Sequence, residues 1–298
     1  MPSLRSKLMS VALRRYVRPR LMRLSIDEHR RSSAARARLF RVSPGTKVEP
    51  VSAADVSGEW VSPVGAAQDD VLFYLHGGGF CTGSSTSCRH FSIRLAQAIG
   101  ARAITIDYRL APEYPFPAAV EDSLAAYHWL LDNGLRAENI VMGGDSAGGN
   151  LAMATLVALR NGGEPLPAAA FCLSPALDMV MTGESLTTRA AADPIFTREY
   201  VEWIAPLYVG SGDPRNPLMS PLYADLSGLP PLLVHVGDDE IMLSDSTRLA
   251  EYAKNAGVDA TLKVWEGMFH VFHVFPFLPE ARQAVDEIGV FARKYLAK

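Results

Sequence analysis

The chain has 298 residues, of which 48% are hydrophobic and 20% charged, and its mean hydropathy is +0.07. This composition is ordinary for a globular protein with a sizeable core, and the length fits one α/β domain over residues 1–298. No stretch approaches the roughly 18 apolar residues of a membrane span, so we expect no stable membrane insertion.

The net charge of −3 conceals a basic N-terminal arm. Residues 1–41 contain 12 Lys/Arg and two acids, a net charge of +10, whereas residues 42–298 carry −13. Such an arm could bind nucleic acid, an anionic membrane surface or the acidic body of its own protein. Apolar residues at helical spacing (Leu8, Ala12, Tyr16) favour the last, so we expect no nucleic-acid partner. An organelle transit peptide is the remaining alternative.

From about residue 71, short apolar runs alternate with longer amphipathic ones. Strands are predicted at 71–75, 103–107, 140–143, 168–173, 232–236 and 260–264, and helices at 87–99, 118–131, 147–160, 245–256 and 279–296. Strict alternation of strand and helix predicts a mostly parallel sheet with helices on both faces.

Two stretches break this alternation. One is the basic arm, about 1–45, and the other is about 178–218, where four prolines interrupt short helical segments. A long insertion between core strands is where such a fold usually carries a lid. We therefore expect the two stretches to form one helical cap.

The three cysteines are odd in number and lack the spacing of metal ligands, so we expect neither disulfides nor a bound metal. They are Cys81, Cys88 and Cys172. Reduced thiols favour a cytoplasmic location.

The strongest local signal is Gly144-Asp145-Ser146-Ala147-Gly148, a G-x-S-x-G sequence between a predicted strand and a predicted helix. Small residues on either side of the serine allow the tight turn that presents a nucleophile. A glycine-rich phosphate-binding turn is the alternative, but the P-loop lysine and the Rossmann glycine spacing are absent. We predict that Ser146 is a nucleophile.

A second glycine-rich sequence, His76-Gly77-Gly78-Gly79, follows the first of these strands. Consecutive glycines leave backbone N–H groups free to face a ligand. We expect the N–H groups of Gly77, Gly78 and Ala147 to form an oxyanion hole, where each donor lowers the barrier by about 3 kcal/mol.

A serine nucleophile needs a base, and the base needs an orienting carboxylate. In hydrolases with this turn the acid and then the histidine follow the serine along the chain, each at the end of a strand. Strand 232–236 precedes three acids (Asp238, Asp239, Glu240), and strand 260–264 precedes two histidines (His270, His273). The residues alone leave these alternatives open.

Four motifs resemble those of the hormone-sensitive-lipase family of α/β-hydrolases, in the bacterial family IV esterases with GDSAG at the nucleophile. They are HGGGF at 76–80, DYRLAPEYPFPAAVED at 107–122, GDSAGG at 144–149 and GMFHVF at 267–272. The resemblance implies an α/β-hydrolase fold, a two-part cap, hydrolysis of short- to medium-chain acyl esters, and no cofactor.

Carried over residue by residue, the resemblance places the catalytic triad on Ser146, Asp239 and His270. It places the oxyanion hole on the HGGG sequence and the residue after the serine. Many members read Asp-Pro-Leu where this chain has Asp239-Glu240-Ile241, so Asp238 and Glu240 remain candidates for the acid.

The expected substrate is therefore a small-molecule ester, and a homodimer is consistent with the family. A lipase or an amidase could use the same triad, because the choice of leaving group depends on the pocket. A ligand-binding relative without catalysis is disfavoured by the intact serine, acid and histidine.

Overall fold

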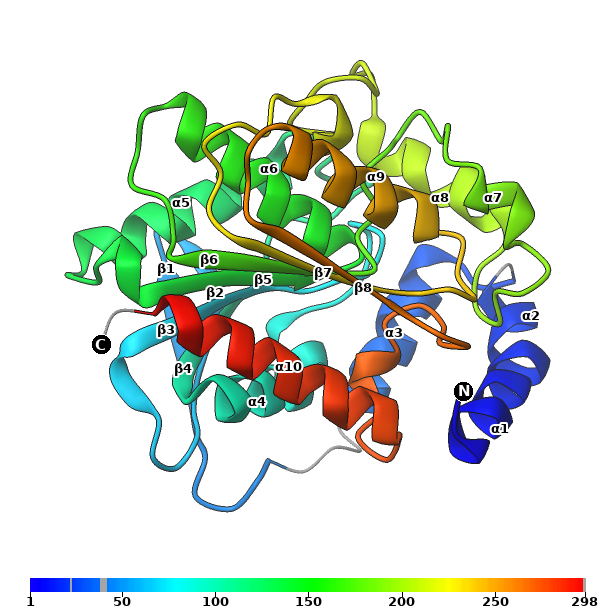
Figure 1. Ribbon diagram of the computed structural model, residues 1–298, viewed down its shortest axis with the longest axis horizontal. Helices are drawn as coiled ribbons and strands as arrows, with labels where there is room; N and C mark the ends of the chain where they lie inside the picture. The colour runs from blue at the N-terminus through cyan, green and yellow to red at the C-terminus, as the bar shows by residue number, and fades with distance from the viewer. Residues whose placement is uncertain (22, 38–41, 297–298) are drawn as a thin grey trace.

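The computed structural model describes residues 1–21, 23–37 and 42–296, which fold around an eight-stranded sheet (Figure 1). The strand order is β1-β2-β4-β3-β5-β6-β7-β8, with β1–β2 and β2–β4 antiparallel and all other neighbours parallel. The strands are β1 Lys47–Ala53, β2 Val56–Ser62, β3 Ala67–Leu75, β4 Ala101–Ile106, β5 Ile140–Asp145, β6 Ala169–Leu173, β7 Leu232–Gly237 and β8 Ala260–Trp265.

Helices cover both faces of the sheet, as predicted (Figure 1). On one face lie α4 (Ser85–Ile99) and α10 (Pro279–Tyr295); on the other lie α5 (Ala118–Asp132), α6 (Ala147–Asn161) and α9 (Leu243–Asn255). The predicted parallel strands and their helices are confirmed from β3 onward. Short 3₁₀ turns occur at Ala137–Asn139, Pro221–Tyr223 and Phe272–Val274.

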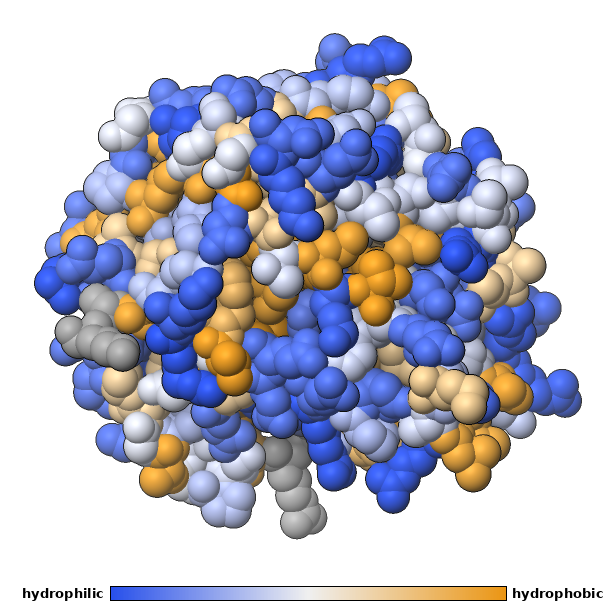
Figure 2. All heavy atoms as spheres, viewed as in Figure 1, coloured by the Kyte–Doolittle hydropathy of each residue, from blue (hydrophilic) through white to orange (hydrophobic). Residues whose placement is uncertain are grey.

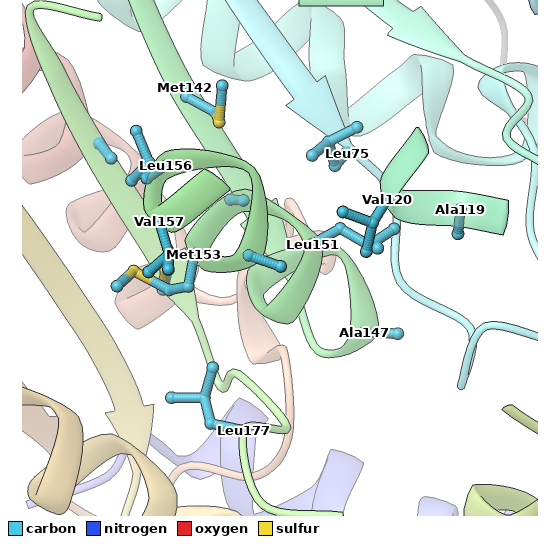
Figure 3. Close-up of a cluster of buried hydrophobic side chains, with 14 of the residues drawn as sticks. Leu75, Ala119, Val120, Met142, Ala147, Leu151, Met153, Leu156, Val157 and Leu177 are labelled. Atoms are coloured by element: carbon cyan, nitrogen blue, oxygen red, sulfur yellow. The ribbon is translucent and has the colours of Figure 1, made fainter. Parts of the chain in front are cut away.

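The core is divided by the sheet into two apolar layers. Phe73 and Leu75 of β3 face the layer that includes Leu151 of α6, part of which is drawn in Figure 3. The alternate residues Leu72 and Tyr74 face the layer under α4 and α10. This alternation follows from the two-residue period of a strand, and it explains why a strand buried on both sides is a continuous apolar run.

The hairpin β1–β2 was not anticipated from the sequence. Both strands lie at one edge of the sheet, and most of their residues are exposed or half-buried. They therefore lack the uninterrupted apolar run by which the central strands are recognised.

The basic arm and the 178–218 insertion lie on the same side of the molecule and contact one another (Figure 1). Arg14 donates hydrogen bonds to the carbonyls of Ala191 and Ala192, each at 2.6 Å. Arg18 donates to the carbonyls of residues 190 and 193. The arm contains α1 (Leu4–Ala12), a π-helical turn (Leu13–Val17), α2 (Arg18–Leu21) and α3 (Ile26–Ala37), and the insertion contains α7 (Ser185–Thr188) and α8 (Arg198–Val209). That the two act as a cap remains a prediction.

Every helix in the described part of the chain is too short or too polar to cross a bilayer.

Candidate active site

Ser146 occupies the sharp turn between β5 and α6. Its backbone has φ +53° and ψ −119°, a conformation that L-residues rarely adopt. Glycines permit this turn: a Cβ on Gly144 would lie 2.2 Å from the carbonyl oxygen of Gly148, and a Cβ on Gly148 would lie 2.0 Å from that of Leu75. The two outer glycines of the motif are therefore required by close packing of strand, turn and helix.

The imidazole of His270 is held by Glu240. Its Nδ1 lies 2.7 Å from Oε2 of Glu240, and both side chains are buried. The prediction that Asp239 faces this histidine is wrong. The chain turns back after β7, and the N–H of Gly237 donates to Oε1 of Glu240 at 2.6 Å, so the third acid of the run points inward.

The other two acids hold the loop that carries His270. Asp238 accepts a hydrogen bond from the N–H of Gly267 at 2.5 Å, and the N–H of Asp239 donates to the carbonyl of Met268 at 3.0 Å. The side chain of Asp239 is half-buried, and its burial together with the nearby Asp238 raises the pKa of its carboxyl. Both aspartates thus hold the loop before His270 without touching its ring.

The environment of His270 favours its protonated form more than water does. Burial lowers the pKa of the imidazole, but the hydrogen bond and the negative charge of Glu240 outweigh it, and the pKa is raised above its ordinary value. Phe196 packs edge-on against the ring, with centroids 4.8 Å apart. Since Nδ1 is engaged by Glu240, Nε2 is the nitrogen left to exchange a proton with a nucleophile.

His273, the other candidate base, lies against His235 and not against Glu240. Its ring is fully buried and stacks on His235 with centroids 5.6 Å apart, while its carbonyl accepts a hydrogen bond from Arg94.

Ser174, directly after β6, was missed by the sequence analysis. Its hydroxyl donates to Oε1 of Glu240 at 2.7 Å and accepts from the N–H of Val271 at 3.2 Å, so it connects the acid to the residue after His270. Its φ of +48° is unusual for serine. The only signal in the sequence was its position at the end of a predicted strand.

The expected donors of the oxyanion hole need one correction. The N–H of Gly77 already donates to Oδ1 of Asp145 at 3.0 Å, and the hydroxyl of Tyr74 donates to the same oxygen. Among the described residues, none accepts a hydrogen bond from the N–H of Gly78 or Gly79. The unengaged donors of this loop are therefore those of Gly78 and Gly79, and the first N–H of α6 is that of Ala147.

The chain was compared with protein families and with solved structures. A family model described as alpha/beta hydrolase fold matches residues 72–274. The crystal structure of an esterase from the bacterial hormone-sensitive lipase family superimposes with a TM-score of 0.94 at 46% identity, over 100% of both chains. The chain belongs to the hormone-sensitive-lipase family of α/β-hydrolases.

Curated relatives within this family carry esterase names. An acetyl-hydrolase of Streptomyces hygroscopicus is 45% identical over 254 residues, which are 85% of this chain and 83% of the relative. An esterase of Acinetobacter venetianus is 37% identical over 86% of this chain and 84% of its own length. The protein is a carboxylic ester hydrolase.

The insertion of this esterase packs directly on the loop of Gly77, Gly78 and Gly79, called the glycine loop below. A Cβ on Gly79 would lie 2.7 Å from Cδ1 of Ile204 in α8, so the helix and the loop are in close contact. The next residue, Phe80, stacks on Tyr208 of the same helix with centroids 3.6 Å apart. Phe196, which touches His270, stacks on Tyr200. The side chains that α8 presents to the glycine loop and to Phe196 are therefore apolar or aromatic.

Asp193 connects the insertion of the esterase to the loop that carries Glu240. Its buried carboxylate accepts hydrogen bonds from the N–H groups of Ile195 and Phe196 and, at 3.0 Å, from that of Ile241. Ile241 directly follows Glu240. No motif marked this aspartate, because Ile241, its partner outside the insertion, is 48 positions away in the sequence.

A separate hollow of about 320 Å³ lies at the opposite end of α6 from Ser146, and Val157 and Arg160 are among its lining residues. It shares no lining residue with the site described above. Within the described residues, no group of three or more His, Cys, Asp or Glu side chains is arranged to hold a metal ion.

Proposed function

We propose that this esterase hydrolyses short- to medium-chain acyl esters through an acyl-enzyme on Ser146, with His270 as base and Glu240 as the orienting acid. The observation that carries this proposal is the 2.7 Å contact between Nδ1 of His270 and Glu240. A carboxylate at this position fixes the tautomer in which Nε2 is the acceptor, and it stabilises the imidazolium that forms.

In the first half of the reaction, Oγ of Ser146 attacks the ester carbonyl carbon while its proton passes to Nε2 of His270. The tetrahedral intermediate collapses, the bond to the alcohol oxygen breaks, and His270 returns the proton to the leaving alcohol. A water molecule then attacks the acyl-enzyme, again giving a proton to His270, which passes it to Ser146 as the acid leaves.

The oxyanion of both intermediates is proposed to lie against the N–H groups of Gly78, Gly79 and Ala147. These donors are fixed before the reaction, so they stabilise negative charge without reorganisation, at about 3 kcal/mol each. The start of α6 contributes further, since the N-terminal end of a helix favours an anion.

The short acyl chain is the finer part of the proposal. Ile204 and Phe80 stand close to the glycine loop, where they would limit the space beside the carbonyl group. The acetyl-hydrolase name of the Streptomyces relative agrees with a small acyl group. We also propose that the arm and the insertion act as a cap over this site, since they are joined through Arg14 and Arg18.

A cytoplasmic location is proposed from the three cysteines, all of which are free thiols. A homodimer is retained as a proposal from the resemblance to the family.

Replacing the nucleophile tests the mechanism. Ser146→Ala should fold normally and lose hydrolysis of nitrophenyl acetate and butyrate by several orders of magnitude. An organophosphate should label the wild-type protein at one site and leave the variant unlabelled, as read by intact mass spectrometry. Labelling of the variant would exclude Ser146 as the nucleophile. Nitrophenyl esters from acetate to palmitate, with an amide analogue as control, test the substrate class.

A further inference from the structure

Helix α1 presents an apolar face to solvent. Leu4, Leu8 and Val11 are 72%, 62% and 63% exposed, and their spacing of four and three residues places them on one side of the helix. In the face-on view of the molecule, apolar side chains lie at the surface over α1, surrounded by hydrophilic ones (Figure 2).

The opposite side of α1, and of the π-helical turn that continues it, is firmly docked. Leu13 is buried in a cluster with Met268 and Phe269, and Met9 packs against that cluster. At the start of α1, the carboxylate of Glu280 accepts hydrogen bonds from Ser3 and Ser6. The helix therefore cannot rotate to bury its outer leucines, and they remain available to a partner.

The charge that the segment itself carries has a single sign, although Glu266 pairs with the N-terminal amine and Glu280 accepts from Ser3 and Ser6. Residues 1–26 include seven Lys/Arg and no acidic residue, in a chain whose net charge is −3. Lys7, Arg14 and Arg15 are exposed on or next to α1. An apolar stripe bordered by cations is the pattern of a helix that lies in the headgroup region of a membrane.

We propose that the outer face of α1 adsorbs to anionic lipid surfaces, with Leu4, Leu8 and Val11 in the interface and the flanking cations on the headgroups. A second copy of the chain fits this face less well. A two-fold contact through α1 would set cations against cations, with no acid in the segment to pair with them. Adsorption needs no spanning helix, since only one face of α1 enters the interface.

Adsorption would also bring the catalytic loop to the lipid. The inner face of the helix packs against the cluster that includes Met268 and Phe269, the two residues before His270, so about one helix diameter, ~10 Å, would separate this loop from the bilayer. An esterase held in this way would meet esters that partition into membranes.

Co-sedimentation of the full-length enzyme with sucrose-loaded vesicles tests the proposal. We expect binding to phosphatidylglycerol/phosphatidylcholine vesicles at least ten-fold tighter than to pure phosphatidylcholine, and weaker binding as NaCl is raised. The triple variant Leu4→Gln/Leu8→Gln/Val11→Gln and the double variant Lys7→Gln/Arg15→Gln should each weaken this binding about ten-fold or more.

A matched control replaces three exposed valines elsewhere on the surface. Val64→Gln/Val264→Gln/Val290→Gln should bind vesicles like the wild type. All variants should hydrolyse dissolved nitrophenyl butyrate at the wild-type rate, so a failure of vesicle binding is distinguishable from a failure of the catalytic proposal. Equal binding by the leucine variant and the wild type would overturn the inference. So would a wild-type dimer, seen by sedimentation velocity, that this variant abolishes.

Discussion

Both oxygens of the Glu240 carboxylate have hydrogen-bonding partners. Oε2 holds His270, and Oε1 accepts hydrogen bonds from the N–H of Gly237 and the hydroxyl of Ser174. Donors of this kind fix the rotamer of a buried acid. Glu240 therefore presents its carboxylate to the imidazole in one orientation, which a freely rotating surface acid would not.

Glu240→Gln should lower kcat on the order of 10⁴-fold, as in other serine hydrolases whose triad carboxylate is replaced by an amide. The negative charge that raises the pKa of His270 is lost, so this pKa falls. Because turnover needs the neutral imidazole, the acid limb of kcat/KM should move to lower pH. The pH profile of nitrophenyl butyrate hydrolysis measures both effects.

Asp239→Asn is the matched control for this experiment. Its side chain has no contact with the ring of His270, so kcat should fall by less than about three-fold and the acid limb should stay in place. The opposite pattern, an inactive Asp239→Asn beside an active Glu240→Gln, would restore the acid expected from the family resemblance.

Two residues of the insertion contact the loop of Glu240: Ser185, whose hydroxyl donates to the carbonyl of Ile241 at 2.6 Å, and Asp193. The carboxylate of Asp193 accepts three backbone hydrogen bonds, one of them from Ile241 next to Glu240. Arg14 and Arg18 of the arm bind the carbonyls of residues 190–193, immediately before and at this aspartate. A series of hydrogen bonds thus links the arm to the insertion and the insertion to the loop of Glu240.

Asp193→Ala should leave three N–H groups without their acceptor, at a cost of about 1–3 kcal/mol for each that stays buried. We expect a Tm lower by several degrees and a kcat lower by roughly 10²-fold, since the acid loop is displaced. Thermal unfolding and nitrophenyl butyrate kinetics measure the two effects.

Asp213→Ala is the appropriate comparison, because this aspartate of the same insertion caps an exposed turn at Arg215. It should leave both properties unchanged. Equal effects of the two substitutions would show that Asp193 has no specific connection to the active site.

Buried strands and helices could be predicted from the sequence, because a buried segment forms a recognisable pattern of apolar residues. Apolar runs predict the strands from β3 to β8, and the glycine spacing predicts the sharp turn at Ser146. The sequence did not show which of three adjacent acids contacts His270, because the turn after Gly237 decides which side chain points inward. Gly77 was assigned wrongly because its acceptor, Asp145, is 68 positions away. Contacts between distant loops leave no local pattern.

At the scale of the whole molecule, two buried histidines couple stability to pH. His235 and His273 stack on one another, and no ring nitrogen of either has a hydrogen-bond partner in the described structure. Burial, with a contribution from Lys263, lowers the pKa of His235 to about 3. Burial lowers the pKa of His273 well below its usual value, with further contributions from His235 and Arg94. Glu287, at 3.9 Å from His235, is too far for a hydrogen bond.

Acidification should therefore destabilise the fold. Below pH 6.5 the unfolded chain binds protons that the buried rings do not, so the free energy of unfolding falls, by about 2 kcal/mol for His235 at pH 5. His270 acts in the opposite direction, since its pKa is raised in the folded state. Urea unfolding at pH 7 and pH 5 measures the sum.

His235→Phe should show a smaller difference between pH 7 and pH 5 than the wild type, whatever its stability at pH 7. An unchanged difference would show that this ring does not contribute.

The carboxylate of Asp145 makes the nucleophile motif dependent on a second part of the chain. Tyr74 and Gly77 both donate to it, and Tyr74 is fully buried. An apolar residue in its place would leave a buried hydroxyl without an acceptor and would release the N–H that anchors the glycine loop. The five-residue sequence 144–148 therefore depends on residues outside it. Transferred into another hydrolase, it would need a tyrosine at the position of Tyr74, three residues before Gly77.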